Sequence, residues 1–233
     1  MSAAAAPVDL RLLLAERFPD AVVLPERRAA PQPTGVARLD QILPNGGLPR
    51  GRLTIWNAAQ GSGAVAVLRA ACFGALARGE RAAWIDGQGT TGPHWKTGPL
   101  LIRPSSLLGA LRAAEIVLKS GGFALVVLVG VDPEQTAMLR LSRMVQEGGG
   151  AFVALTHRTL TASLRLTSRF LITEYRKSTS PFGDTARIDA VTVRIEAYAS
   201  GWRADTTLDL PALTHDLRLS LDPGLADRRG ALD

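Results

Sequence analysis

The sequence is poor in cysteine, lysine, aromatic residues and long apolar runs. A single cysteine, Cys72, excludes a disulfide within the chain and points to a reducing compartment. Only three of the 27 basic residues are lysines, so arginine carries almost all of the net charge of +6. Arginine suits contacts with phosphate and carboxylate groups. The apolar runs are about as long as strands, and residues 1–10 lack the pattern of a signal peptide. We therefore expect a cytoplasmic protein without a membrane span.

What is present begins with an amino-terminal arm, residues 1–33. Apolar residues at helical spacing fall within residues 8–18, a short extended piece follows, and residues 25–33 form a proline-rich connector. An apolar stripe must be buried, either on the chain's own core or on another molecule. The candidate partner-binding residues of this arm are Leu10, Leu13, Leu14, Phe18 and Ala21.

Residues 34–210 read as one core, because strand-like and helical segments alternate along them. Helices are expected at 64–77 and 107–119, and buried strands at 53–56, 82–86, 100–102, 123–129 and 151–156. This alternation predicts an α/β fold with a mostly parallel sheet flanked by helices. From residue 169 the alternation becomes that of antiparallel hairpins, over 169–175, 189–199 and 203–210. The tail, residues 211–233, is expected to be loosely ordered.

Two helix starts carry capping signals. Ser105 or Ser106 is expected to cap the helix that begins at Leu107. Asp132 is expected to cap the next helix, with Pro133 at its first position and Gln135 completing a capping box.

The strand 53–56, a small-residue loop and the helix from Ala64 together form the scaffold of a phosphate-binding loop. Such a loop needs a lysine and then a serine or threonine at its end, and here those positions are Ala64 and Val65. Backbone N–H groups near Gly61 and Gly63 remain as an anion cradle, but nothing neutralises a β- or γ-phosphate or holds Mg²⁺. An ordinary strand-to-helix turn explains the same glycines.

In order and spacing, residues 34–200 resemble the ATPase core of RecA-type recombinases. The resemblance rests on Thr34-Gly35, Leu39-Asp40, the Gly46–Arg52 turn, the Ile85-Asp86 strand end and the apolar run 123–129. It implies a RecA-like fold with antiparallel edge strands and the amino-terminal arm.

The departures from that family are concentrated where ATP would react. The first glycine of the phosphate loop falls on Ala58, and the water-activating glutamate falls on Gln88. The family's magnesium-linked acid falls near Leu128 or Val129, its switch glutamine on His157, and its adenine-stacking aromatic on Trp95. We therefore expect no ATP hydrolysis, no cofactor and no catalytic residue. The scattered histidines predict no metal site.

A shortened RecA-like chain without the ATP residues is similar to the ImuA family of SOS-mutagenesis proteins, often described as SulA-like. That resemblance implies a non-enzymatic role in the SOS DNA damage response and translesion synthesis. The implied partners are RecA, an ImuB-like homologue of Y-family polymerases and an error-prone polymerase of the replicative type. A nucleotide-dependent ATPase with an atypical loop and a cell-division inhibitor of the SulA type are the alternatives.

Two further patterns bear on partners. Basic residues gather after residue 157 and predict either a solvated surface or weak, salt-sensitive contact with single-stranded DNA. The candidate DNA-contacting residues are Arg158, Arg165, Arg169, Arg176 and Lys177. Residues 18–21 match F-x-x-A, the pattern with which Rad51-type recombinases dock on a neighbour. Local packing of Phe18 explains this match equally well.

Overall fold

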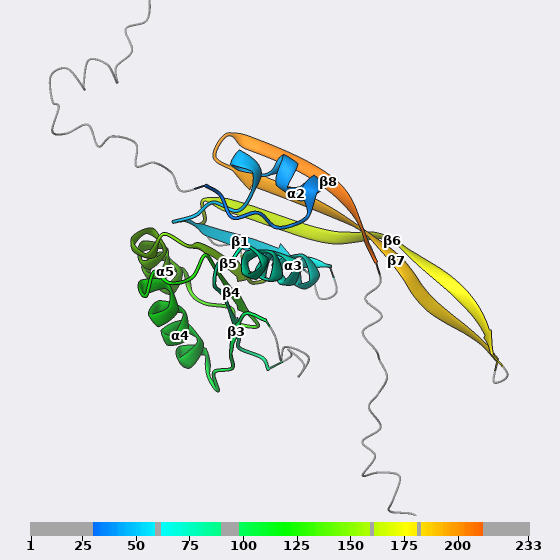
Figure 1. Cartoon of the computed structure of the whole chain (residues 1–233), viewed down its shortest axis with the longest axis horizontal. Coiled ribbons are helices and arrows are strands. Elements are labelled where there is room, and N and C mark those ends of the chain that lie inside the picture. The colour runs from blue at the N-terminus through cyan, green and yellow to red at the C-terminus, as the bar shows by residue number, and fades with distance from the viewer. Residues whose placement is uncertain (1–29, 59–61, 90–97, 159–160, 181–182, 212–233) are drawn as a thin grey trace, which may run out of the picture. The chain divides into compact units, whose positions relative to one another are not determined.

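The computed structural model describes residues 30–58, 62–89, 98–158, 161–180 and 183–211 (Figure 1). At Ala58, Pro211 and residues 172–190, which include Arg176 and Lys177, the description concerns the backbone alone. Several sequence predictions lie outside the described residues: the arm with Leu10, Leu13, Leu14, Phe18 and Ala21, then Gly61, Trp95 and the tail 212–233.

The described chain forms one eight-stranded sheet in the order β3-β2-β4-β5-β1-β6-β7-β8. The strands from β3 to β6 in this order are parallel, and β7 and β8 add antiparallel neighbours at one edge. This confirms the predicted RecA-like α/β class. The strands are β1 Leu53–Ala58, β2 Ala82–Asp86, β3 Leu100–Ile102, β4 Leu125–Val129, β5 Ala151–Leu155, β6 Leu164–Ser180, β7 Gly183–Ala199 and β8 Trp202–Pro211.

Helices cover the two faces of the sheet unequally. One apolar cluster lies between the sheet and the helices α2 and α3, and it reaches across to β7 and β8. The other lies under α4 and α5, and its buried members come from β1, β2, β4 and β5 in addition to the helices. The helical segments are α2 Ala37–Ile42, the 3₁₀ turn η1 Pro44–Gly46, α3 Ala64–Ala77, α4 Leu107–Lys119 and α5 Gln135–Gly148.

The central strands and helices form where the sequence predicts them. Every residue of β2 and of β4 is buried, as expected for parallel strands covered on both faces. Ser106, and not Ser105, caps α4, because its Oγ accepts a hydrogen bond from the N–H of Gly109 at 3.1 Å. Gly149, with φ of 72°, supplies the left-handed residue that ends α5.

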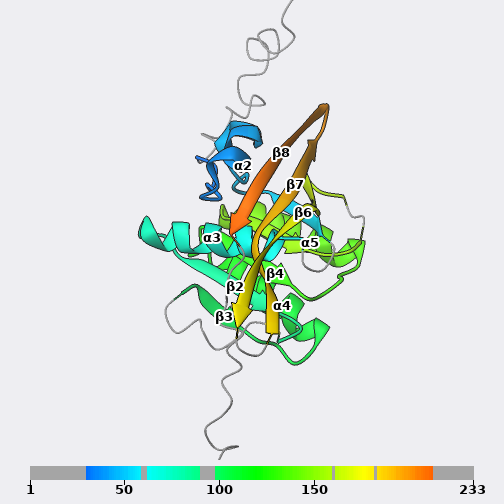
Figure 2. The same cartoon turned by 90° about the vertical axis from the view of Figure 1, so that its right-hand side faces the viewer.

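The first predicted edge strand is longer than its polar pattern suggested. It starts at Leu164 and not at Arg169, because Leu164 and Leu166 are buried and pair with β1 in parallel register. The β1 pairing ends at Ser168, and the β7–β8 pairing ends at Ala190. Beyond these points β6 and β7 continue as a two-stranded ribbon, visible in yellow in Figure 1 and end-on in Figure 2.

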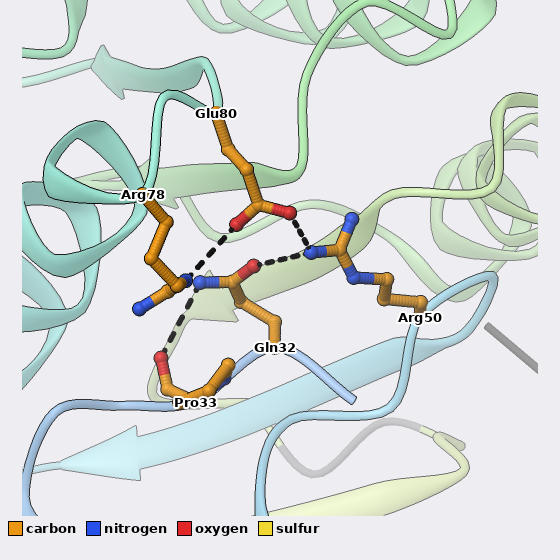
Figure 3. A network of polar contacts seen from close by, with 5 residues as sticks. All are labelled: Gln32, Pro33, Arg50, Arg78 and Glu80. Carbon is orange, nitrogen blue, oxygen red and sulfur yellow. Dashed lines mark hydrogen bonds and ion pairs between the residues drawn. The ribbon is translucent and has the colours of Figure 1, made fainter. Parts of the chain in front are cut away.

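A polar network fixes the lead-in to β1 against the end of α3 (Figure 3). Buried Gln32 accepts a hydrogen bond from Arg50 at 3.0 Å, and its backbone bridges to Leu48. Arg50 also pairs with Glu80, which Arg78 contacts at 3.3 Å. Partial burial alone raises the pKa of Glu80, but these two guanidinium groups hold that pKa below its usual value. The network lies beside a shallow hollow of about 360 Å³ at the edge where the strands begin.

Candidate functional site

The carboxyl ends of the parallel strands are where α/β folds place ligands, and the loop between β1 and α3 lies at this edge. Three buried polar groups fix this loop from the sheet side. Trp56 Nε1 donates to Ser168 Oγ at 3.0 Å, and Ser168 Oγ donates to Ser62 Oγ at 3.0 Å. All three residues are buried, so β1, β6 and the end of the loop are tied to one another without any ligand.

The last glycine of the loop is a close-packing position. Gly63 has φ of 80°, in the left-handed region, and directly precedes α3. A Cβ built on it would lie 2.7 Å from Leu210 Cδ1 and 3.1 Å from Val193 Cγ2. Apolar side chains of β7 and β8 therefore press against the loop, and glycine is required here for packing as well as for conformation.

The two residues that follow Gly63 cannot bind a nucleotide through their side chains. Ala64, the first residue of α3, is buried in the core cluster, whereas Val65, the second residue, is 49% exposed. Neither side chain has a charge or a hydroxyl group. The α3 terminus has no side-chain cap and no acidic residue in its first turn. Among the described groups of this helix start, the backbone N–H groups and the helix dipole are what could attract an anion.

At the end of β2 the buried Asp86 accepts a hydrogen bond from the N–H of Gln88 at 3.2 Å. The Gln88 side chain lies against Gly130, just after β4, where a Cβ would meet Gln88 Cγ at 2.7 Å. Gln88 has no ionisable group, so it cannot accept the proton of an attacking water.

Asp132 does not cap α5, and this corrects the sequence prediction. The helix begins at Gln135, with Glu134 in the cap position and no side-chain cap bond. Asp132 instead accepts hydrogen bonds from Thr156 Oγ1 at 2.5 Å and from the N–H of His157 at 3.0 Å. The Thr156 hydrogen bond is the largest cause that lowers the pKa of Asp132, and partial burial opposes it.

Two further hydrogen bonds hold the segment that follows β5. Asn57 Nδ2, in β1, donates to the carbonyl oxygen of His157 at 3.3 Å. Gln135 Oε1 accepts from the N–H of Thr161 at 3.0 Å, so it holds the connection to β6 and forms no capping box. The segment after β5 is thus held by hydrogen bonds to three side chains, those of Asp132, Asn57 and Gln135.

The described residues offer little chemistry beyond these contacts. They contain no group of three or more histidine, cysteine, aspartate or glutamate side chains that could hold a metal ion. Burial raises the pKa of the Cys72 thiol to about 12, so Cys72 is a packing residue and a poor nucleophile. Among the helices of this part of the chain, none is both long and apolar enough to cross a bilayer.

The structure brings the predicted basic residues together only in part. Arg165 and Arg169 share one exposed face of β6, and Arg158 lies in the segment after β5. Residues that sequence reasoning missed join them across the sheet: Arg194 and Tyr198 from β7, and Arg203 from β8. Tyr198 is an aromatic residue between these arginines, because it pairs in register with Arg165 on one side and Arg203 on the other.

A carboxylate of β7, Glu196, lies among these arginines. Glu196 lies 3.4 Å from Arg194, 3.4 Å from Arg203 and 3.9 Å from Arg169, and it accepts a hydrogen bond from the Tyr198 hydroxyl. The Tyr198 hydrogen bond, followed by the three positive charges, lowers the pKa of Glu196. We name this surface, formed by the outward residues of β6, β7 and β8, the arginine face. Because alternate residues of a strand share one face of the sheet, the arginine face could have been predicted from the sequence if the register of the strands had been known.

No protein-family model matches the chain. Among curated proteins it is similar to RecA of Mycobacterium leprae, with 32% identity over 140 residues, which are 57% of this chain and 19% of the relative. RecA of Frankia casuarinae is 31% identical, and RecA of Mycobacterium marinum 32% identical, over 57% of this chain and 39% of each relative. The chain therefore spans about a fifth to two fifths of the length of these curated relatives. The chain is thus RecA-like, with low sequence identity to these RecA proteins.

Proposed function

We propose that this chain is a non-enzymatic RecA-like accessory protein of SOS-induced translesion DNA synthesis, as its similarity to the ImuA family implies. The main support comes from the start of α3, residues 63–65, where a RecA-type ATPase would hold its nucleotide. Ala64 and Val65 stand where a lysine and a hydroxyl would act, and Leu210 and Val193 pack against Gly63. A RecA-like core without those groups has no means of energising its own cycle.

The proposed partners are RecA, an ImuB-like homologue of Y-family polymerases and an error-prone replicative-type polymerase. The chain combines a RecA-like core with the predicted arm, residues 1–33, but lacks the residues that would hold ATP at a subunit boundary. Such a protomer can join a RecA filament through one contact and fail to extend it. It would limit filament growth and direct lesions to the mutagenic polymerase.

RecA strand exchange with sub-stoichiometric amounts of this protein tests the filament role. The wild type is expected to inhibit exchange. Phe18→Ala is expected to weaken inhibition by roughly 30-fold, since truncating an interface anchor typically costs about 2 kcal/mol. Leu12→Ala is the matched control, because Leu12 stands outside the predicted partner-binding set.

The outcomes separate the parts of the proposal. No effect of wild-type protein on RecA contradicts the filament role. Inhibition that survives deletion of residues 1–33 places the contact in the core. Co-purification of the tagged chain with each polymerase subunit tests the second set of partners. Binding to a tubulin-like division protein in place of RecA would favour the SulA-type alternative.

Weak contact with single-stranded DNA is a second part of the proposal, through the arginines after β5 and on β6. The structure places Glu196, Asp205 and Asp209 on the same face, which reduces its net positive charge. We therefore expect DNA affinity to be low and to fall steeply with salt. Unchanged binding after charge reversal at Arg158 would remove that residue from the interface.

A further inference from the structure

The helix layer on one face of the sheet stops short of β6. On that face α4 and α5 bury side chains of β1, β2, β4 and β5, and no buried residue of β6, β7 or β8 belongs to this cluster. Arg165 pairs in parallel register with Ile55, a member of the cluster, so the two side chains leave the same face. The outward residues of the last three strands thus lie beside the helices with no described element over them.

Those outward residues form three rows across the strands. The rows follow directly from the antiparallel registers, in which alternate residues share a face. They are Arg165–Tyr198–Arg203, Thr167–Glu196–Asp205 and Arg169–Arg194–Thr207. The opposite side of β7 carries Val193, Ile195 and Ala197, all buried in the core. The core is therefore built by this apolar side, and the charged residues on the opposite, open side are not needed to form it.

The arginines of this face retain hydrogen-bonding capacity. A guanidinium has five N–H donors, and one carboxylate accepts about four hydrogen bonds. Glu196 is shared by three guanidinium groups and the Tyr198 hydroxyl. The side chains of Arg169 and Arg203 remain 63% and 64% exposed, and Arg203 stacks over the Tyr198 ring at 5.1 Å. Glu196 thus orients these groups while their outer N–H donors point to solvent.

We propose that the arginine face binds a carboxylate-bearing segment of a partner protein. Planar guanidinium groups match carboxylates in bidentate geometry, and arginine and tyrosine are enriched in protein interfaces. Glu196, Asp205 and Asp209 alternate with the arginines, so an evenly charged polyphosphate would meet repulsion across the middle row. A peptide with spaced carboxylates meets the arginines without this penalty. The proposal rests on this face alone and is independent of the filament role.

Fluorescence anisotropy with a labelled peptide of five Glu-Ser repeats, whose carboxylates are spaced, and with an oligothymidylate of equal charge, tests this assignment. The full chain should bind the Glu-Ser peptide more tightly than the oligothymidylate at matched salt. Arg165→Gln with Arg203→Gln should weaken peptide binding by about tenfold or more. Arg112→Gln with Arg143→Gln, on exposed positions of α4 and α5, removes the same net charge and should leave binding within about twofold.

A variant of opposite effect sharpens the test. Glu196→Gln removes the internal carboxylate and should strengthen binding of the Glu-Ser peptide, since Arg169 and Arg203 lose their competing partner, whereas Arg194 keeps Asp205 at 3.1 Å. Thermal unfolding of each variant checks that the sheet is intact. The proposal is overturned if the α4 and α5 control weakens binding equally. It is also overturned if only oligothymidylate binding depends on Arg165 and Arg203, or if Glu196→Gln weakens binding of the peptide.

Discussion

At the scale of single residues, the connection from β1 to α3 is held to β6 by buried polar contacts. Trp56 Nε1 has Ser168 Oγ as its partner, and Ser168 in turn donates to Ser62. Removing an acceptor from a buried donor costs the full desolvation of that donor. The direction of these two hydrogen bonds therefore predicts which serine substitution lowers the free energy of unfolding more.

We predict that Ser168→Ala lowers the free energy of unfolding by about 1–3 kcal/mol, because it leaves the indole N–H of Trp56 unpaired in the core. Ser62→Ala should cost less, because Ser168 still accepts from Trp56 in that variant and its own hydroxyl hydrogen is free to rotate to another acceptor, which the indole N–H is not. Urea unfolding followed by tryptophan fluorescence gives both values. Equal losses would mean that the hydrogen bond to Trp56 adds nothing beyond the packing of the serines.

A second residue-scale prediction concerns Asp132. Its folded-state pKa is depressed, chiefly by the Thr156 hydrogen bond, so its stabilisation is present above the unfolded-state pKa and is lost as pH falls through the folded value. Asp132→Asn should therefore lower stability by about 1 kcal/mol at neutral pH, a modest figure because the carboxylate is exposed. The difference from wild type should shrink as pH falls below the ordinary aspartate range and the carboxylate becomes protonated. A pH-independent difference in urea midpoints would contradict the ionic origin.

At the scale of elements, α4 offers a clean test of capping. Ser105 and Ser106 are adjacent, exposed and chemically identical, but only Ser106 accepts from the N–H of Gly109. Ser106→Ala is expected to cost about 1 kcal/mol, and Ser105→Ala close to nothing. Thermal unfolding of the two variants makes the comparison. A larger loss for Ser105→Ala would contradict the assigned cap.

The elements also show how far sequence reasoning reaches. Helix 64–77 and strands 82–86 and 100–102 form with the predicted bounds, because apolar periodicity is a local property. Asp132 was assigned to a helix cap by its neighbours Pro133 and Gln135, yet its partners, Thr156 and His157, lie just after β5, more than twenty residues away. Glu196 and Tyr198 were not predicted for the same reason, since the β6–β7 register brings Tyr198 beside Arg165 and Glu196 within 3.9 Å of Arg169. Local patterns do not encode such long-range contacts.

At the scale of the whole molecule, binding of a nucleotide is a property of the assembled edge and not of two residues. Ala64 lies in the core cluster, and Leu210 and Val193 bring apolar side chains of the hairpin strands against Gly63. The substitutions Ala64→Lys and Val65→Thr would add a charge and a hydroxyl group to an edge where apolar side chains pack closely. Gln88 would still lack a carboxylate.

We therefore predict that 1 mM MgATP leaves the melting temperature of the wild type and of the Ala64→Lys, Val65→Thr variant unchanged. A ligand present at about 100 times its dissociation constant stabilises a protein by roughly 2.7 kcal/mol. For a chain of this size that shift is about 5–10 °C, well within the precision of scanning calorimetry. A rise in the wild type would contradict the loss of nucleotide binding. A rise in the variant alone would show that the edge kept its shape and lost only its charge, which would place the loss of ATP binding in two side chains instead of in the packing of β7 and β8.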